Sequence, residues 1–152
     1  MVDIPDVICN GVFDKEFRRG RVIKTLFRCH DGKERFKFLV ILNKDPVRDP
    51  TLYFLTTSQL DFYNKYPNYN KDIIRVTKGD LVFFPNETII DCRHVYKSSR
   101  EMFKKNFRNK TLRFEGDLPL KFMQDINRIV EQSFFIPKAD KDIILKDGIK
   151  SV

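Results

Sequence analysis

Apolar and β-branched residues occur in short runs separated by polar turns over the first third of the chain. Three of these runs, residues 21–29, 36–42 and 51–57, predict the first strands of a sheet. The Asp31-Gly32 pair between the first two runs is a hairpin signal. The run over 36–42 is the most apolar in the chain, which is typical of a strand buried on both faces.

The pattern is less regular on both sides of these runs. Residues 1–17 predict an irregular lead-in, because a proline and a glycine interrupt them. Residues 58–71 combine tyrosines with Asn, Gln and Pro, which predicts a polar, aromatic loop. Three further short strands are expected over 73–76, 81–84 and 88–93.

Helical spacing appears in the last third of the chain. The Ser98-x-x-Glu101 spacing of a capping box predicts the start of a short helix. Residues 118–133 place apolar side chains at helical spacing and predict the longest helix, and residues 141–145 predict one last turn. Residues 112–116 are compatible with an edge strand.

The order of these elements predicts a mainly β protein with C-terminal helices, an α+β fold. Strands that follow one another closely along the chain, and are then followed by helices, favour a small β-barrel or a curled sheet against which those helices pack. The length of 152 residues fits a single domain over 1–152. We expect the barrel at about 17–96 and the helical and strand C-terminal part at about 97–152.

Composition narrows the class of protein. An apolar content of 41% excludes a disordered chain, and no apolar run approaches the length that spans a membrane. The N-terminal residues lack the pattern of a secretory signal. An odd number of cysteines in unrelated contexts favours reduced thiols and a cytoplasmic location. These cysteines are Cys9, Cys29 and Cys92.

The net charge of +8 favours polyanionic partners. Residues 93–113 hold eight basic residues and one acidic residue, hence a net charge of +7. This window can attract RNA phosphates, or it can be a solvated helix face and loop.

Two groups of residues carry candidate chemistry. Cys29-His30 and Cys92-x-His94 contain metal-ligand types, but neighbours on a strand face opposite sides, so no metal site and no cofactor are expected. No phosphate-binding glycine loop or hydrolase signature occurs.

Basic and hydroxyl residues flank two strands that are expected to pair. His30, Arg35 and Lys37 surround the hairpin turn, and Thr56 and Thr57 end the neighbouring strand. Cleavage of RNA without a metal needs a base, an acid and a cation on the phosphorane, which these residue types can supply. They are equally compatible with an ordinary surface turn and strand end. The tyrosines of 58–71 can stack on bases or fix the loop to the barrel.

The order of motifs resembles the PemK/MazF family, small SH3-like barrels that include messenger-RNA-cleaving toxins of type II toxin–antitoxin systems. Residues 19–23 stand at the family's opening Arg-Gly-Asp-Ile-Val-type strand, 37–42 at its Arg-Pro-x-Leu-Val-Leu-type strand, and 54–58 at its Pro-Leu-Thr-Ser-type motif. The helix over 118–133 is similar to the family's terminal helix. The resemblance covers roughly residues 17–135.

The resemblance implies a metal-independent endoribonuclease that cleaves single-stranded mRNA, on an SH3-like barrel of the PemK/MazF/CcdB type. It implies three partners: single-stranded RNA, an antitoxin protein whose extended tail fills the RNA groove, and a second copy of the chain in a homodimer. The catalytic residues would be Arg35, Lys37, Thr57 and His30. The RNA-binding residues would be Arg21, Thr56, Ser58 and Gln59.

Three departures from the family pattern keep a second function open. Arg21 stands where the family has Asp, Lys37 where it has Arg, and Phe38 where it has Pro. Lysine lacks the bidentate phosphate contact of a guanidinium. The alternative is therefore a catalytically inactive SH3-like barrel that acts as a nucleic-acid- or protein-binding module.

Overall fold

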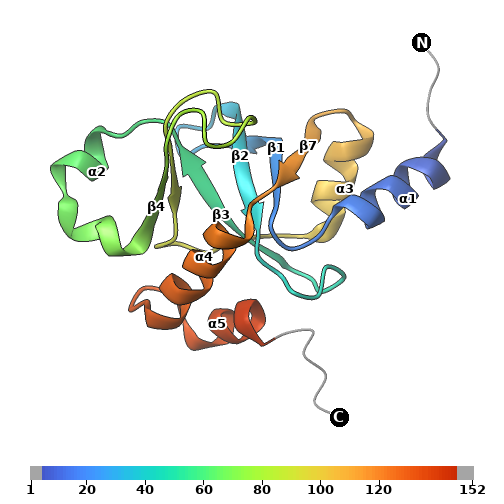
Figure 1. Cartoon of the computed structure of the whole chain (residues 1–152). Coiled ribbons are helices and arrows are strands. Elements are labelled where there is room, and N and C mark those ends of the chain that lie inside the picture. Colours follow the sequence, from blue (N-terminus) through green and yellow to red (C-terminus); the bar gives the residue numbers. More distant parts are fainter. Residues whose placement is uncertain (1–4, 147–152) are drawn as a thin grey trace.

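In the computed structural model, which describes residues 5–146, seven strands form one antiparallel sheet (Figure 1). The strand order is β4-β5-β3-β2-β1-β7, and β6 also pairs with β3. Along one edge of β3, the first half of the strand pairs with β6 and the second half pairs with β5. The strands are β1 (Arg21–Arg28), β2 (Glu34–Ile41), β3 (Thr51–Thr57), β4 (Ile73–Val76), β5 (Thr88–Asp91), β6 (Tyr96–Ser98) and β7 (Leu112–Asp117).

The two faces of the sheet are covered by different helices. Successive side chains of a strand point to opposite faces, so neighbouring residues of one strand pack against different helices. Val22, Val40 and Phe54 pack with apolar residues of α4 and α5. Ile23 and Leu39, each one residue along, pack with aromatic residues of α1 and α3. The helices are α1 (Asp6–Glu16), α2 (Asp61–Lys65), η1 (Pro67–Asp72, a 3₁₀ helix), α3 (Arg100–Arg108), α4 (Leu120–Gln132) and α5 (Lys138–Leu145).

The sheet is not closed into a barrel. Strands β4 and β7 stand at the two ends of the strand order and do not pair, and the segment 77–87 between β4 and β5 lies against β7. A Cβ atom at Gly116 would lie 2.9 Å from a ring carbon of Phe83, so the absence of a side chain there admits the ring. Leu81 and Phe84 enter the same core as α4. The α+β class expected from the sequence is therefore confirmed, with an open sheet.

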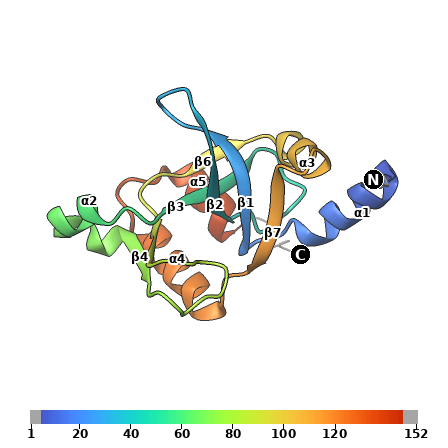
Figure 2. The same ribbon diagram turned by 90° about the horizontal axis from the view of Figure 1, so that it is seen from above.

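The β1–β2 hairpin extends beyond the helices (Figure 2). Consequently the first half of β2 is solvent-accessible, and only residues 39–42 are fully buried. The prediction that residues 36–42 are buried on both faces is therefore correct only for residues 39–42. The end of the sheet next to this hairpin is not covered by the helices and is exposed to solvent.

Three local predictions are wrong, two of them because tertiary contacts outweigh a local signal. Residues 6–16 form α1 and not an irregular lead-in, since Phe13 and Phe17 are buried against α3 and the sheet. Residues 81–84 form a turn and not a strand: Leu81 and Phe84 are buried in the core, Phe83 lies against Gly116 of β7, and Val82 is exposed. Residues 58–71 contain α2 and most of η1.

The remaining helix predictions are correct to within a few residues. The side chain of Ser99, one position after the expected Ser98, accepts a hydrogen bond from the Met102 amide at 3.1 Å and caps α3. Helix α4 begins at Leu120 and α5 extends the expected last turn. None of the described helices is long and apolar enough to cross a membrane.

Candidate nucleic-acid interface

The pairing of β2 with β3 brings two of the predicted catalytic residues together. Leu39 lies opposite Leu55, so Lys37 and Thr57, each two residues further towards the open end of the sheet, project from the same face. Both line one hollow of about 200 Å³. We call it the central hollow; its lining is Phe36, Lys37, Phe38, Thr56, Thr57, Ser58, Gln59, Pro85, Asn86 and Thr88.

Lys37 also lines a second hollow of about 700 Å³, beside the β1–β2 hairpin. The half-buried side chains of Phe27, Leu55 and Tyr96 contribute apolar surface, and the exposed His30 and Arg35 contribute polar groups. The structure thus places His30 and Arg35 beside Lys37, and Lys37 beside Thr57. We call this the hairpin hollow; its lining is Phe27, Arg28, Cys29, His30, Asp31, Arg35, Lys37, Leu55 and Tyr96.

Arg35 and Lys37 have different surroundings. Arg35 donates hydrogen bonds of 3.3 and 2.7 Å to the carboxylate of Asp31. These bonds, with one from the Lys33 amide, lower the pKa of Asp31. Among residues 5–146, Lys37 has no carboxylate within ion-pair distance. Of these two cations, Lys37 is therefore the one whose positive charge is available to a phosphate.

The hydroxyl groups at the end of β3 are partly occupied. Thr56 is buried and donates from its side chain to the Phe38 carbonyl at 3.1 Å, which ties β3 to β2. Thr57 accepts a hydrogen bond from the Gln59 amide at 3.1 Å and can still donate. Ser58 and Gln59 are exposed.

A third hollow, of about 860 Å³, continues from the central hollow. Residues 57–59 line both. Its walls include the ring of Phe62 and the guanidinium of Arg93. We call it the aromatic hollow; its lining is Thr57, Ser58, Gln59, Leu60, Asp61, Phe62, Tyr63, Asn64 and Arg93.

Arg93 is held in place by Asp91. The guanidinium donates hydrogen bonds of 3.0 and 2.9 Å to the two carboxylate oxygens of Asp91, and the Tyr63 hydroxyl donates a third of 2.8 Å. Burial alone raises the pKa of Asp91, but the hydrogen bonds from Arg93 and Tyr63 lower it on balance. Burial, together with the bond to Asp91, raises the pKa of Tyr63 to about 12. The sequence pattern did not indicate Phe62, and it indicated Arg93 only as part of the basic window 93–113. The Asp91-x-Arg93 spacing, which places both side chains on the same side of a strand end, was the available signal for their pairing.

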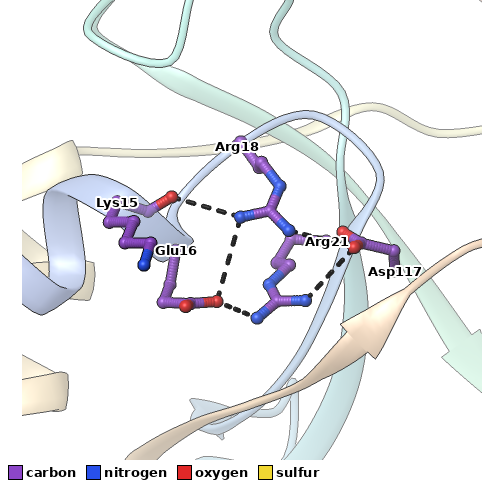
Figure 3. A network of polar contacts seen from close by, with 5 residues as sticks. All are labelled: Lys15, Glu16, Arg18, Arg21 and Asp117. Carbon is purple, nitrogen blue, oxygen red and sulfur yellow. Dashed lines mark hydrogen bonds and ion pairs between the residues drawn. The ribbon is translucent and has the colours of Figure 1, made fainter.

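Arg21 lies at the other end of β1, roughly 23 Å from the hairpin for seven residues of extended strand. Arg21 forms ion pairs with Glu16 and Asp117, the latter at 3.4 Å. Arg18 forms ion pairs with the same two carboxylates (Figure 3). The network connects the end of α1 to β7. The structure therefore does not place Arg21 with the other predicted RNA-binding residues.

The basic window over 93–113 does not form one free cationic surface. Within residues 5–146, at least five of its eight basic side chains lie within 4.0 Å of a carboxylate oxygen, and all of these acids are outside the window. Four carboxylates outside the window therefore balance part of its net charge of +7. The five are Arg93 with Asp91, Lys97 with Asp140, Arg100 and Lys104 with Asp14, and Arg113 with Glu115.

Residues 5–146 contain no group of three or more His, Cys, Asp or Glu side chains arranged to hold a metal ion. The fold and these hollows define a small α+β protein whose antiparallel sheet ends in a basic and aromatic surface. No protein-family model matches the chain, and a search of curated proteins finds no significant match.

Proposed function

We propose that this chain binds single-stranded RNA across the hairpin, central and aromatic hollows, with Lys37 as the central phosphate contact. The observation that carries the proposal is the position of Lys37. It lines two adjoining hollows and has no carboxylate partner among residues 5–146. Phe27 and Tyr96 supply aromatic surface in the hairpin hollow. Cations beside aromatic rings are the combination that binds single-stranded nucleic acids.

The PemK/MazF resemblance supports this proposal. Strands β1, β2 and β3 form an antiparallel meander, and β5 continues it. We assign this arrangement to an open relative of the SH3-like barrel. The same resemblance favours a homodimer, a cytoplasmic location and an antitoxin whose extended tail occupies the RNA surface.

A second candidate function is metal-independent cleavage of the bound RNA. One observation favours it: Lys37 shares one hollow with His30 and another with Thr57. The 2′-hydroxyl would attack the adjacent phosphorus, His30 would take its proton, and the bond to the 5′-oxygen would break as that oxygen takes a proton from solvent water. Lys37 would stabilise the charge of the phosphorane, and Thr57 would orient the phosphate. The products are a 2′,3′-cyclic phosphate and a 5′-hydroxyl.

Binding of a labelled single-stranded RNA of about twelve nucleotides, measured at several salt concentrations in EDTA, tests the first proposal. We expect Lys37→Ala to weaken binding about tenfold and to reduce the salt slope by about 0.7. Lys121→Ala is the matched control, because it removes an exposed positive charge from α4, which covers the other face of the sheet. Equal effects of the two variants, or no salt-dependent binding by the wild type, would contradict the proposal.

End-group analysis of the same RNA tests cleavage. Fragments with 2′,3′-cyclic phosphate ends that disappear in both Lys37→Ala and Thr57→Ala would establish the ribonuclease. Intact RNA under conditions where a gel shift shows binding would leave the binding function and exclude cleavage.

A further inference from the structure

Four rings and one guanidinium form a cluster beside the aromatic hollow. The rings of Phe62 and Tyr69 are nearly parallel, at 14° and 5.7 Å between centroids. The guanidinium carbon of Arg93 lies 4.4 Å from the Tyr69 centroid and 5.2 Å from that of Phe62. Tyr63 and Tyr66 contact Phe62 at 5.2 and 5.0 Å. The cluster holds Phe62 in place, yet this side chain is 44% exposed and lines the hollow.

The charge of this hollow is unsuited to a phosphate. Asp91 compensates the positive charge of Arg93 through two hydrogen bonds, and Asp61 adds a carboxylate to the lining. The other polar groups are neutral, and they include the exposed amides of Gln59 and Asn64. An exposed ring beside amide donors and acceptors matches the flat face and the polar edge of a nucleobase.

The hollow also lies in the right place for a nucleotide next to the phosphate contact. Residues 57–59 separate it from the central hollow, which Lys37 lines. We infer that the aromatic hollow binds one unpaired nucleobase of the RNA strand, stacked against Phe62, next to the nucleotide whose phosphate contacts Lys37. This inference rests on the proposed RNA binding and adds a base-recognition site to it.

An abasic scan of the RNA, combined with substitution of Phe62, tests the inference. The probe is an uncleavable 2′-fluoro oligonucleotide in which one base at a time is removed. With the wild-type protein, one abasic position is expected to weaken binding about tenfold, the usual effect of losing one stacked base. With Phe62→Ala, intact and abasic strands are expected to bind equally at that position, and Phe62→Trp is expected to restore the difference.

Phe134→Ala is the matched control, since this phenylalanine is 92% exposed and does not line the aromatic hollow. It should leave the abasic profile unchanged. If Phe62→Ala lowers the melting temperature, Phe62→Leu gives the same comparison, because leucine keeps apolar volume and removes the aromatic face.

The outcomes separate this inference from the function on which it rests. If Lys37→Ala weakens RNA binding but every abasic penalty is the same in wild type and Phe62→Ala, the base site is excluded and RNA binding stands. If Lys37→Ala and Lys121→Ala bind RNA as the wild type does, the proposed function fails and the base site fails with it. A Phe62→Ala effect on the association of two copies of the chain, without any on the abasic profile, would assign the hollow to a protein contact and overturn the inference.

Discussion

Arg35 and Asp31 face each other across the turn of the β1–β2 hairpin, where the guanidinium donates two hydrogen bonds to the carboxylate at 3.3 and 2.7 Å. Both side chains are about half exposed. The pair compensates the charge of Arg35, and its hydrogen bonds lower the pKa of Asp31, which stays ionised at neutral pH. Asp31 therefore limits how strongly the hairpin hollow attracts an anion.

Removal of the Asp31 charge is expected to strengthen RNA binding. Asp31→Asn frees the guanidinium of Arg35 for a phosphate, so affinity should rise several-fold and the salt slope should increase by about 0.7. Binding of single-stranded RNA at several salt concentrations measures both. Asp80→Asn, in an exposed turn, changes the net charge equally and serves as the control. An unchanged affinity in Asp31→Asn would show that Arg35 does not contact the RNA.

Helix α1 is expected to be an integral part of the fold. Phe13 is fully buried and stacks on Phe17 with 4.7 Å between ring centroids. Phe13→Ala should therefore lower the free energy of unfolding by about 3–5 kcal/mol. Val12→Ala, a neighbouring substitution at an exposed site of the same helix, should change it by less than about 0.5 kcal/mol. Urea unfolding of both variants measures the difference; similar values would mean that α1 is not packed as described.

The Tyr63 hydroxyl is expected to make stability depend on alkaline pH. Its pKa is about 12 in the folded chain and 10.0 in the reference state. Between these values the unfolded chain loses the proton while the folded chain retains it, so the free energy of unfolding decreases as pH rises from 10 to 12. Below pH 10 the full contribution of this group is present.

Tyr63→Phe removes this dependence. The variant should lose about 1 kcal/mol of stability at pH 8 and show a smaller further decrease towards pH 12 than the wild type. Tyr66→Phe changes an exposed hydroxyl and should follow the wild type. Urea unfolding at pH 8 and about pH 11 measures the effect. Parallel pH curves for wild type and Tyr63→Phe would show that burial and the Asp91 hydrogen bond do not raise the pKa of Tyr63 in the folded chain.

Much of the sheet could be predicted because its signals are local. The runs that became β1, β2 and β3 are rich in β-branched and aromatic residues, and the Asp31-Gly32 turn sets the hairpin between the first two. Pairing of adjacent strands then places Lys37 beside Thr57 without further information. The expected grouping of His30, Arg35 and Lys37 follows from the same hairpin.

The sequence by itself determined where β1, β2 and β3 lie, where α3, α4 and α5 lie to within a few residues, and which basic residues surround the hairpin, because these follow from neighbours along the chain. Only the tertiary structure decided that residues 6–16 form a helix, that the sheet stays open, and that Arg21 belongs to an ion-pair network with Asp117. It also decided which cations are compensated, since Lys97 meets Asp140 and Arg100 meets Asp14 across the fold. Burial and ion pairing are set by distances in space between residues far apart in the chain, and a local pattern contains no such distance.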